Sequence, residues 1–160
     1  MGLAFDASSL ILLEEIGLVS SVLRLGIDLV TTGAVIDEVH SIALRTIAKG
    51  GKIRIASARE RSLPAELRLG LGPGEISIIE FVVETPGFWA VLDERRARAV
   101  AQSLGIRYLG TARIVKHLAD RGILGKAEAR GLLESLPSLG FYIERSVIEE
   151  IFREPMLDLE

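Results

Sequence analysis

The chain has 160 residues, of which 49% are hydrophobic and 26% charged, and its formal net charge is −3. This composition fits one globular domain with its own core, and it excludes a disordered chain. The absence of cysteine excludes a disulfide framework and a thiolate metal site, and no apolar run reaches the ~18 residues of a membrane span.

Strand-like and helix-like segments alternate along the chain. We expect strands at residues 3–5, 28–31, 53–55, 88–92 and 107–109. We expect helices at residues 8–16, 18–25, 33–48, 74–84, 94–103, 112–121, 126–136 and 146–153. This alternation predicts an α/β fold with a parallel sheet covered on both faces. The polar residues 59–71 are the expected mobile connection, and residues 126–160 a helical extension packed on a single domain that spans residues 1–160.

Two aspartates directly follow predicted strands. Asp6 comes after the first strand and Asp93 after the fourth. In open parallel sheets, ligands bind beyond the carboxyl ends of the strands. Either aspartate alone could equally be a helix N-cap. Two of them at the same edge favour a site.

Two glutamates fall on helix faces that should be apolar. Spacing of three and four residues puts Glu38 on an inward stripe with Ala34, Val35 and Ile42. Glu75 opens its helix on the face of Ile79 and Val82. An inward carboxylate is costly unless it is paired, hydrogen-bonded or bound to metal. Alternatively, Glu38 could pair with a buried arginine, and the helix dipole could favour Glu75.

Four carboxylates at one edge suit Mg²⁺ or Mn²⁺, which prefer oxygen ligands. We expect Asp6 and Asp93 to be direct ligands, while Glu38 and Glu75 bind through water or orient a nucleophile. Such a metal lowers the pKa of bound water and stabilises charge on a phosphodiester. Supporting hydrogen bonds are expected from Ser9 and Thr111, unless these are ordinary helix-start residues.

The histidines and the glycine-rich segment do not indicate a further catalytic site, and the arginines have two interpretations. His40 and His117 lack metal-spaced partners and are predicted to be surface residues. The glycine-rich residues 70–74 have neither a preceding strand nor a following lysine, so they predict a turn and no phosphate loop. The arginines after Asp93 either contact RNA phosphates or form a solvated helix face; the candidates are Arg95, Arg98 and Arg113.

Several short segments, in their order and spacing, resemble the PIN-domain nucleases, the fold of VapC-type toxins. The resemblance covers almost the whole chain and rests on residues 5–11, 32–39, 71–75 and 92–98, with 101, 104–105 and 110–111 following. It implies a three-layer α/β/α fold that cuts single-stranded RNA with Mg²⁺ or Mn²⁺. It places Asp6, Glu38, Glu75 and Asp93 at the family's acidic positions, with Glu94 where relatives often carry a second aspartate.

Three functions follow as alternatives. The first is a metal-dependent ribonuclease, with the toxin of a type II toxin–antitoxin pair, held by an antitoxin protein, as a special case. The second is a catalytically silent PIN-like module that binds RNA or protein, which Glu94 and Ala112-Arg113 favour because they depart from the family pattern. The third is another phosphohydrolase, but a haloacid-dehalogenase-like enzyme needs an aspartate where this chain has Ser8.

The setting of the protein follows from broader features. With no basic segment before its first apolar stretch, we expect a cytoplasmic protein without a signal peptide. The absence of asparagine and the preference for arginine fit a thermophile or, equally, a biased genome. Apolar helices at residues 10–13 and 76–83, together with the resemblance, predict a homodimer; the competing account is that the C-terminal helices cover these faces.

Overall fold

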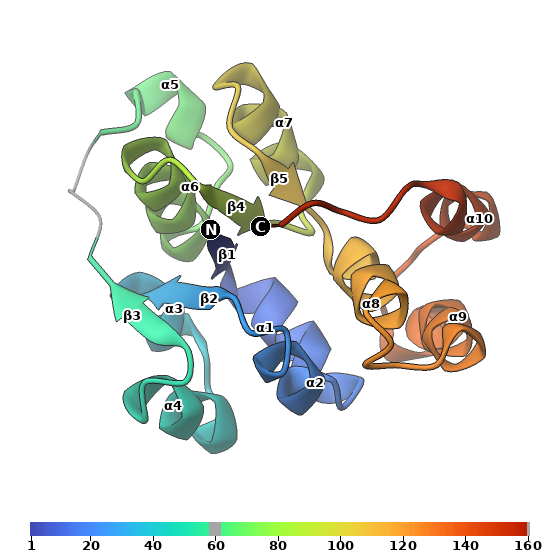
Figure 1. Ribbon diagram of the computed structural model, residues 1–160. Coiled ribbons are helices and arrows are strands. Elements are labelled where there is room, and N and C mark those ends of the chain that lie inside the picture. Colours follow the sequence, from blue (N-terminus) through green and yellow to red (C-terminus); the bar gives the residue numbers. More distant parts are fainter. Residues whose placement is uncertain (58–61, 160) are drawn as a thin grey trace.

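The computed structural model describes residues 1–57 and 62–159. Within these ranges, five strands form one sheet in the order β3-β2-β1-β4-β5 (Figure 1). All four strand pairs are parallel, so the carboxyl ends of the strands share one edge. This confirms the predicted α/β fold with a parallel sheet. The strands are β1 (Gly2–Phe5), β2 (Asp28–Thr32), β3 (Arg54–Ala56), β4 (Phe88–Val91) and β5 (Tyr108–Leu109).

The first strand is the centre of the core. Leu3, Ala4 and Phe5 are fully buried, because β1 is flanked by β2 and β4 and covered on both faces. A continuous apolar run, without the alternation of a half-exposed strand, is typical of such a position in a parallel sheet. Asp6 therefore follows the central, completely buried strand at the shared edge of the sheet.

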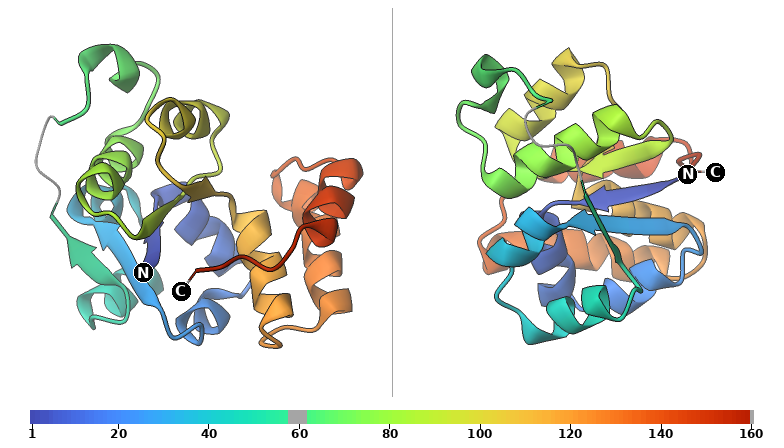
Figure 2. Two further views of the ribbon diagram at one scale, coloured as in Figure 1. Left: turned by 45° about the horizontal axis from the view of Figure 1, so that its top comes forward. Right: turned by 90° about the vertical axis from the view of Figure 1, so that its left-hand side faces the viewer.

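Helices form the two outer layers. Figure 2 shows α6 and α7 on one side of the sheet, and α1, α2 and α8 on the other. The C-terminal helices α9 and α10 contact α8 and each other. The helices are α1 (Ala7–Glu15), α2 (Val19–Leu23), α3 (Gly33–Glu38), α4 (Ile42–Lys49), α5 (Ala65–Arg68), α6 (Pro73–Glu84), α7 (Arg95–Ser103), α8 (Thr111–Asp120), α9 (Lys126–Ser135), the 3-10 helix η1 (Leu136–Leu139) and α10 (Arg145–Arg153).

The predicted single helix over residues 33–48 is wrong. It is two helices, because Val39 takes an extended conformation and ends α3. Ser41 then starts α4 by accepting a hydrogen bond from the Leu44 amide, and its hydroxyl also donates to Glu14 Oε1 at 2.5 Å. The predicted inward face that joined Glu38 to Ile42 therefore does not exist. Ile42 is 83% exposed.

Part of the predicted mobile connection is tied to α6. Residues 59–61 lie outside the described residues, but the remainder contains α5. There Arg68 forms an ion pair with the buried Glu80 at 2.9 Å and donates to the Leu63 carbonyl. Glu80 also accepts the Leu63 amide at 3.1 Å. These contacts link the described part of the connection to α6, and the mobility of the connection stays a prediction.

His117 is buried, with only 4% of its surface exposed, so its prediction as a surface residue is wrong, whereas His40 is exposed. Burial lowers the pKa of His117, and the nearby Arg121 and Lys116 lower it further. Lys116 on the same helix is also buried; its Nζ donates to the carbonyls of Glu154 and Pro155 and pairs with Asp120. The reason is that α8 is covered by several other helices.

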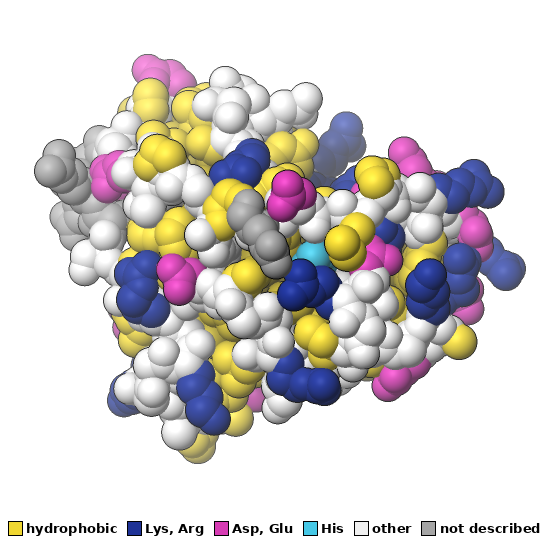
Figure 3. All heavy atoms as spheres, in the orientation of Figure 1, with side chains coloured by type: hydrophobic (Ala, Val, Ile, Leu, Met, Phe, Trp, Pro, Cys, Tyr) yellow, Lys and Arg dark blue, Asp and Glu magenta, His cyan; other side chains and the backbone are white. Residues whose placement is uncertain are grey.

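Both ends of the described chain lie together at the amino-terminal edge of the sheet (Figure 1). Met1 and Leu159 line the same surface cavity. On this face, basic and acidic side chains are interspersed among small hydrophobic areas (Figure 3). Among the described residues, no helix is long and apolar enough to cross a membrane.

Candidate active site

Asp6 sits between β1 and α1 and is completely buried. Its Oδ1 caps α1, accepting hydrogen bonds from the Ser9 amide at 2.8 Å and the Ser9 hydroxyl at 2.6 Å. Its Oδ2 is buried without a hydrogen-bond partner among the described residues. One oxygen thus has a structural role, and the other is free for a ligand.

Asp93 follows β4 but does not cap the next helix, whose N-cap residue is Glu94. Instead, Asp93 accepts hydrogen bonds from Thr111 at the start of α8: from the amide at 2.8 Å and from the hydroxyl at 2.6 Å. The neighbouring Gly110 leaves room for this contact, since a Cβ there would lie 3.1 Å from Asp93 Oδ1. Both oxygens of the Asp93 carboxylate are therefore held by Thr111.

Glu75 stands in the first turn of α6. Its Oε2 accepts the Gly72 amide at 2.9 Å, so the helix-start interpretation holds for this oxygen. Its Oε1 is buried and has no hydrogen-bond partner in the described part of the chain. Asp6 and Glu75 thus share a feature. In each carboxylate, one oxygen accepts hydrogen bonds at the start of a helix and the other has no hydrogen-bond partner among the residues described.

Glu38 does not face the interior as predicted, because α3 ends at this residue and its side chain is exposed. Its Oε1 nevertheless accepts the Gly74 amide at 2.6 Å, at the start of α6. This contact with a helix N-terminus replaces the buried arginine considered as an alternative.

The carboxylates at this edge act on one another. Burial raises the pKa of Asp6 to about 7; repulsion from Asp93 and Glu75 adds to this, and the hydrogen bonds from Ser9 oppose it. The pKa of Glu75 is also raised, first by burial and then by repulsion from Glu94 and Glu38, against the opposing Gly72 hydrogen bond. The structure therefore brings the four predicted acids and Glu94 to one edge.

The arrangement fits a hydrated divalent cation better than a closed cage. Within residues 1–57 and 62–159, no three histidine, aspartate or glutamate side chains form a ready ligand set for a metal ion. Mg²⁺, however, usually keeps several waters and touches only one or two carboxylates. Two buried, unsatisfied carboxylate oxygens, on Asp6 and Glu75, are the groups that such an ion would satisfy, either directly or through its waters.

The three candidate RNA-binding arginines differ in their surroundings. Arg113 is held by Glu154 in a two-point contact of 2.9 and 2.6 Å, which raises its pKa. Arg95 is exposed and Arg98 half-buried, and neither forms a hydrogen bond or ion pair within the described residues. Of the three arginines, only Arg95 and Arg98 therefore have guanidinium groups without such a partner in the described part of the chain.

Sequence reasoning missed the link between α3 and α6. Thr32 and Ser77 are joined through their hydroxyls at 2.6 Å, and Ser77 also donates to the Gly74 carbonyl at 2.7 Å. A serine between two isoleucines, Ile76 and Ile78, was the available signal. The link holds the elements of Glu38 and Glu75 side by side.

Fold and site together define an α/β protein with a carboxylate cluster at the carboxyl edge of a parallel sheet. Residues 3–155 match the model of a family described as DUF3368, a PIN domain, and the chain therefore belongs to the PIN-domain family. PIN domains are generally nucleases that bind nucleic acids and typically use divalent metal ions. Among curated proteins, no match to this chain is found.

Proposed function

We propose that the protein is an endoribonuclease that cuts single-stranded RNA with Mg²⁺ or Mn²⁺ bound at the acidic edge. The observation that carries this proposal is the pair of buried, unsatisfied oxygens, Asp6 Oδ2 and Glu75 Oε1, beside further carboxylates. Without a cation, the burial of these oxygens costs free energy that no hydrogen bond from a described residue offsets. A bound cation compensates this cost of desolvation.

The residues have distinct parts in this proposal. Asp6 and Asp93 hold the cation, because each is fixed by hydrogen bonds at the end of a central strand. Glu38 and Glu75 lie across the edge, where they bind the ion through water or orient the attacking water. When bound, the ion supplies an acidified water and charge stabilisation at the phosphate. Ser9 and Thr111 are positioning residues for the two aspartates.

RNA cleavage with and without EDTA tests the proposal. The wild type should cut single-stranded RNA only with added Mg²⁺ or Mn²⁺, and Asp6→Asn, purified in the same way, should not cut. Asp37→Asn is a matched control, because Asp37 is exposed on α3. Undiminished cleavage in excess chelator would contradict metal dependence. Binding of RNA without any cleavage would support the silent PIN-like module instead.

The toxin role rests on the resemblance alone, and a growth assay tests it separately. Induced expression of the wild type should arrest growth of a bacterial host, and Asp6→Asn should not. Arrest by both proteins would show that toxicity does not come from the acidic site. A short neighbouring gene whose product relieves the arrest would be the antitoxin partner.

A further inference from the structure

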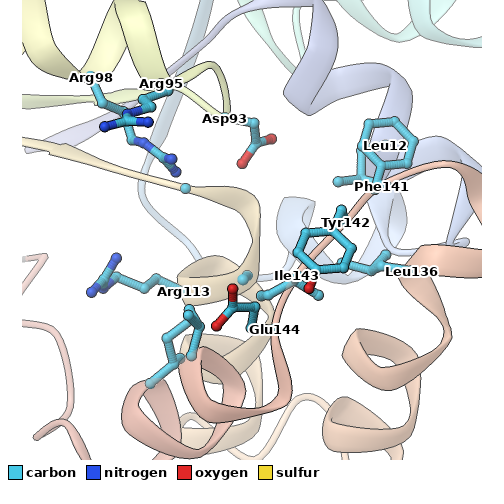
Figure 4. Close-up of a pocket in the computed structure, with 14 residues that line it drawn as sticks. Leu12, Asp93, Arg95, Arg98, Arg113, Leu136, Phe141, Tyr142, Ile143 and Glu144 are labelled. Carbon is cyan, nitrogen blue, oxygen red and sulfur yellow. The ribbon is translucent and has the colours of Figure 1, made fainter.

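A cavity of about 540 Å³ opens beside Asp93 (Figure 4). This volume falls within the ~300–1,000 Å³ typical of small-molecule sites. Its walls come from α1, α7, α8 and the stretch from η1 to α10. We call it the C-terminal pocket. It is continuous with the acidic edge, since Asp93 belongs to both.

One end of the pocket is cationic. Arg95 and Arg98 lie together beside Asp93 in Figure 4. Arg98 Nη1 stands 3.5 Å from the position that a Cβ on Gly110 would take, so the missing side chain leaves space for the guanidinium group. Arg113 also lines the pocket, but its charge is balanced by Glu154. Arg95 and Arg98 therefore remain for an anionic ligand.

The opposite wall is apolar and presents an aromatic ring. Phe141 and Ile143 are half-buried against the core, whereas Tyr142 between them is 83% exposed. The segment is fixed nonetheless: the Phe141 amide donates to the Leu136 carbonyl at 3.1 Å, after a turn at Gly140 with a φ of 85°. An exposed tyrosine, next to this hydrogen-bonded turn, thus lies across the pocket from two arginines (Figure 4).

We propose that the C-terminal pocket binds one nucleotide of the RNA next to the scissile phosphate. Its base stacks on Tyr142 and a phosphate contacts Arg95 and Arg98. The proposal rests on the proposed function, since Asp93 places the pocket beside the cleavage site. Single-stranded nucleic acids are held in this way, by aromatic stacking and by a cationic track along the backbone. The carboxylate of Glu144, beside the apolar wall, repels phosphate and so directs it to the arginines.

Binding of a short oligoribonucleotide that carries 2-aminopurine tests the subsite. The label is placed at successive positions, and Asp6→Asn protein in Mg²⁺ prevents cleavage. We expect quenched fluorescence at one position and its loss in Tyr142→Ala. Affinity should fall about tenfold, whereas Tyr142→Phe should retain both signals. Arg98→Gln should weaken binding and lower the salt slope by about 0.7 per lost phosphate contact.

Each test variant has a matched control outside the pocket. Leu139→Ala, which truncates another exposed apolar side chain, is the control for Tyr142→Ala, and Arg24→Gln, at another exposed arginine, is the control for Arg98→Gln. If Tyr142→Ala and Arg98→Gln both leave RNA binding unchanged, the proposed subsite is overturned. The proposed cleavage at the acidic edge is not affected by that result. Quenching that persists although the wild type never cleaves would overturn the nuclease and keep the subsite. A doubled mass that Tyr142→Ala returns to one chain would identify a protein interface instead, and overturn the proposal.

Discussion

At the scale of single residues, Asp6 combines a helix cap with an unsatisfied oxygen in one carboxylate. The cap explains why an acid is tolerated at a completely buried position, because two hydrogen bonds from Ser9 stabilise it. The free oxygen explains why the site is costly in the absence of a cation, since burial and neighbouring carboxylates both oppose ionisation. Because burial opposes the ionisation of a side chain that is also needed as a helix cap, the titration of Asp6 should be visible in the stability of the protein.

We predict that the metal-free protein loses stability as the pH rises through the titration of Asp6. The pKa in the folded chain, about 7, lies above the ordinary 3.8, so the folded state binds more protons between these values. The free energy of unfolding should therefore fall across this window by about 2–4 kcal/mol and level off above it. Urea denaturation in EDTA at several pH values measures this.

The matched variant is Asp6→Asn, which cannot titrate. Its free energy of unfolding should show a much weaker fall over the same window and exceed that of the wild type in mildly alkaline EDTA. Added Mn²⁺ should raise the melting temperature of the wild type but not of the variant. A large drop in the stability of Asp6→Asn at every pH would show that the carboxylate is structural.

How far the site could be predicted differs from residue to residue. Asp6 and Asp93 were predictable, because an acid after a buried strand is a local pattern and a parallel sheet brings such positions to one edge. The surroundings of Glu38 were not, because they depend on where α3 ends. That end is set by Val39 and by the contact of Ser41 with Glu14, which is distant in sequence.

At the scale of elements, the start of α6 is where two of the site's carboxylates, Glu38 and Glu75, are both held. Its first amides are covered by two carboxylates from different directions: Glu75 accepts the Gly72 amide and Glu38 accepts the Gly74 amide. The absence of a side chain at Gly74 is what lets Glu38 approach, since a Cβ there would come within 2.9 Å of its Oε2. α3 and α6 are thus positioned by the same acids that the proposed reaction needs.

We predict that Gly74→Ala lowers RNA cleavage about 10- to 100-fold by displacing Glu38. Stability should change by no more than about 1 kcal/mol, because a better helix former offsets the lost hydrogen bond. Gly131→Ala on α9 is the control; it meets open space, so it should leave cleavage unchanged and stability level or slightly higher. Equal cleavage by the two variants would remove Glu38 from the site.

Among the elements, strands and helices that follow a local pattern were predicted within a few residues. The break at Val39 was missed because an apolar stripe continues through residues 34–42 in sequence while the chain turns away in space. The burial of His117 was missed for a related reason. Helix α8 contacts α1, α2, α9 and α10, so positions that would be solvated on an isolated helix are covered.

At the scale of the whole molecule, the C-terminal segment is fastened to α8 by Lys116. We predict that Lys116→Met lowers the free energy of unfolding by about 2–4 kcal/mol, because it removes the partner of Asp120 and of two carbonyls. Cleavage well below the melting temperature should be unchanged. Urea denaturation against Lys126→Met, at an exposed position on α9, separates this contact from a general loss of charge.

The oligomeric state is a second prediction at this scale. Leu10, Leu12 and Leu13 of α1 are covered by the chain itself, and Val83 is the large apolar side chain of α6 that is markedly exposed in the structure described. The expected homodimer therefore rests on the resemblance to PIN toxins. Light scattering at micromolar concentration should give twice 17.4 kDa if it forms. A mass of one chain would end that expectation.

The adjacency of the two ends has a practical consequence for handling the protein. Both lie at the amino-terminal edge of the sheet, whereas the carboxylates lie at the opposite edge. A purification tag, a surface tether or a fused reporter at either end is thus held away from the carboxylates. Joining Met1 to Leu159 through a short linker and opening the chain elsewhere would keep every strand neighbour in place, since termini that lie together permit circular permutation.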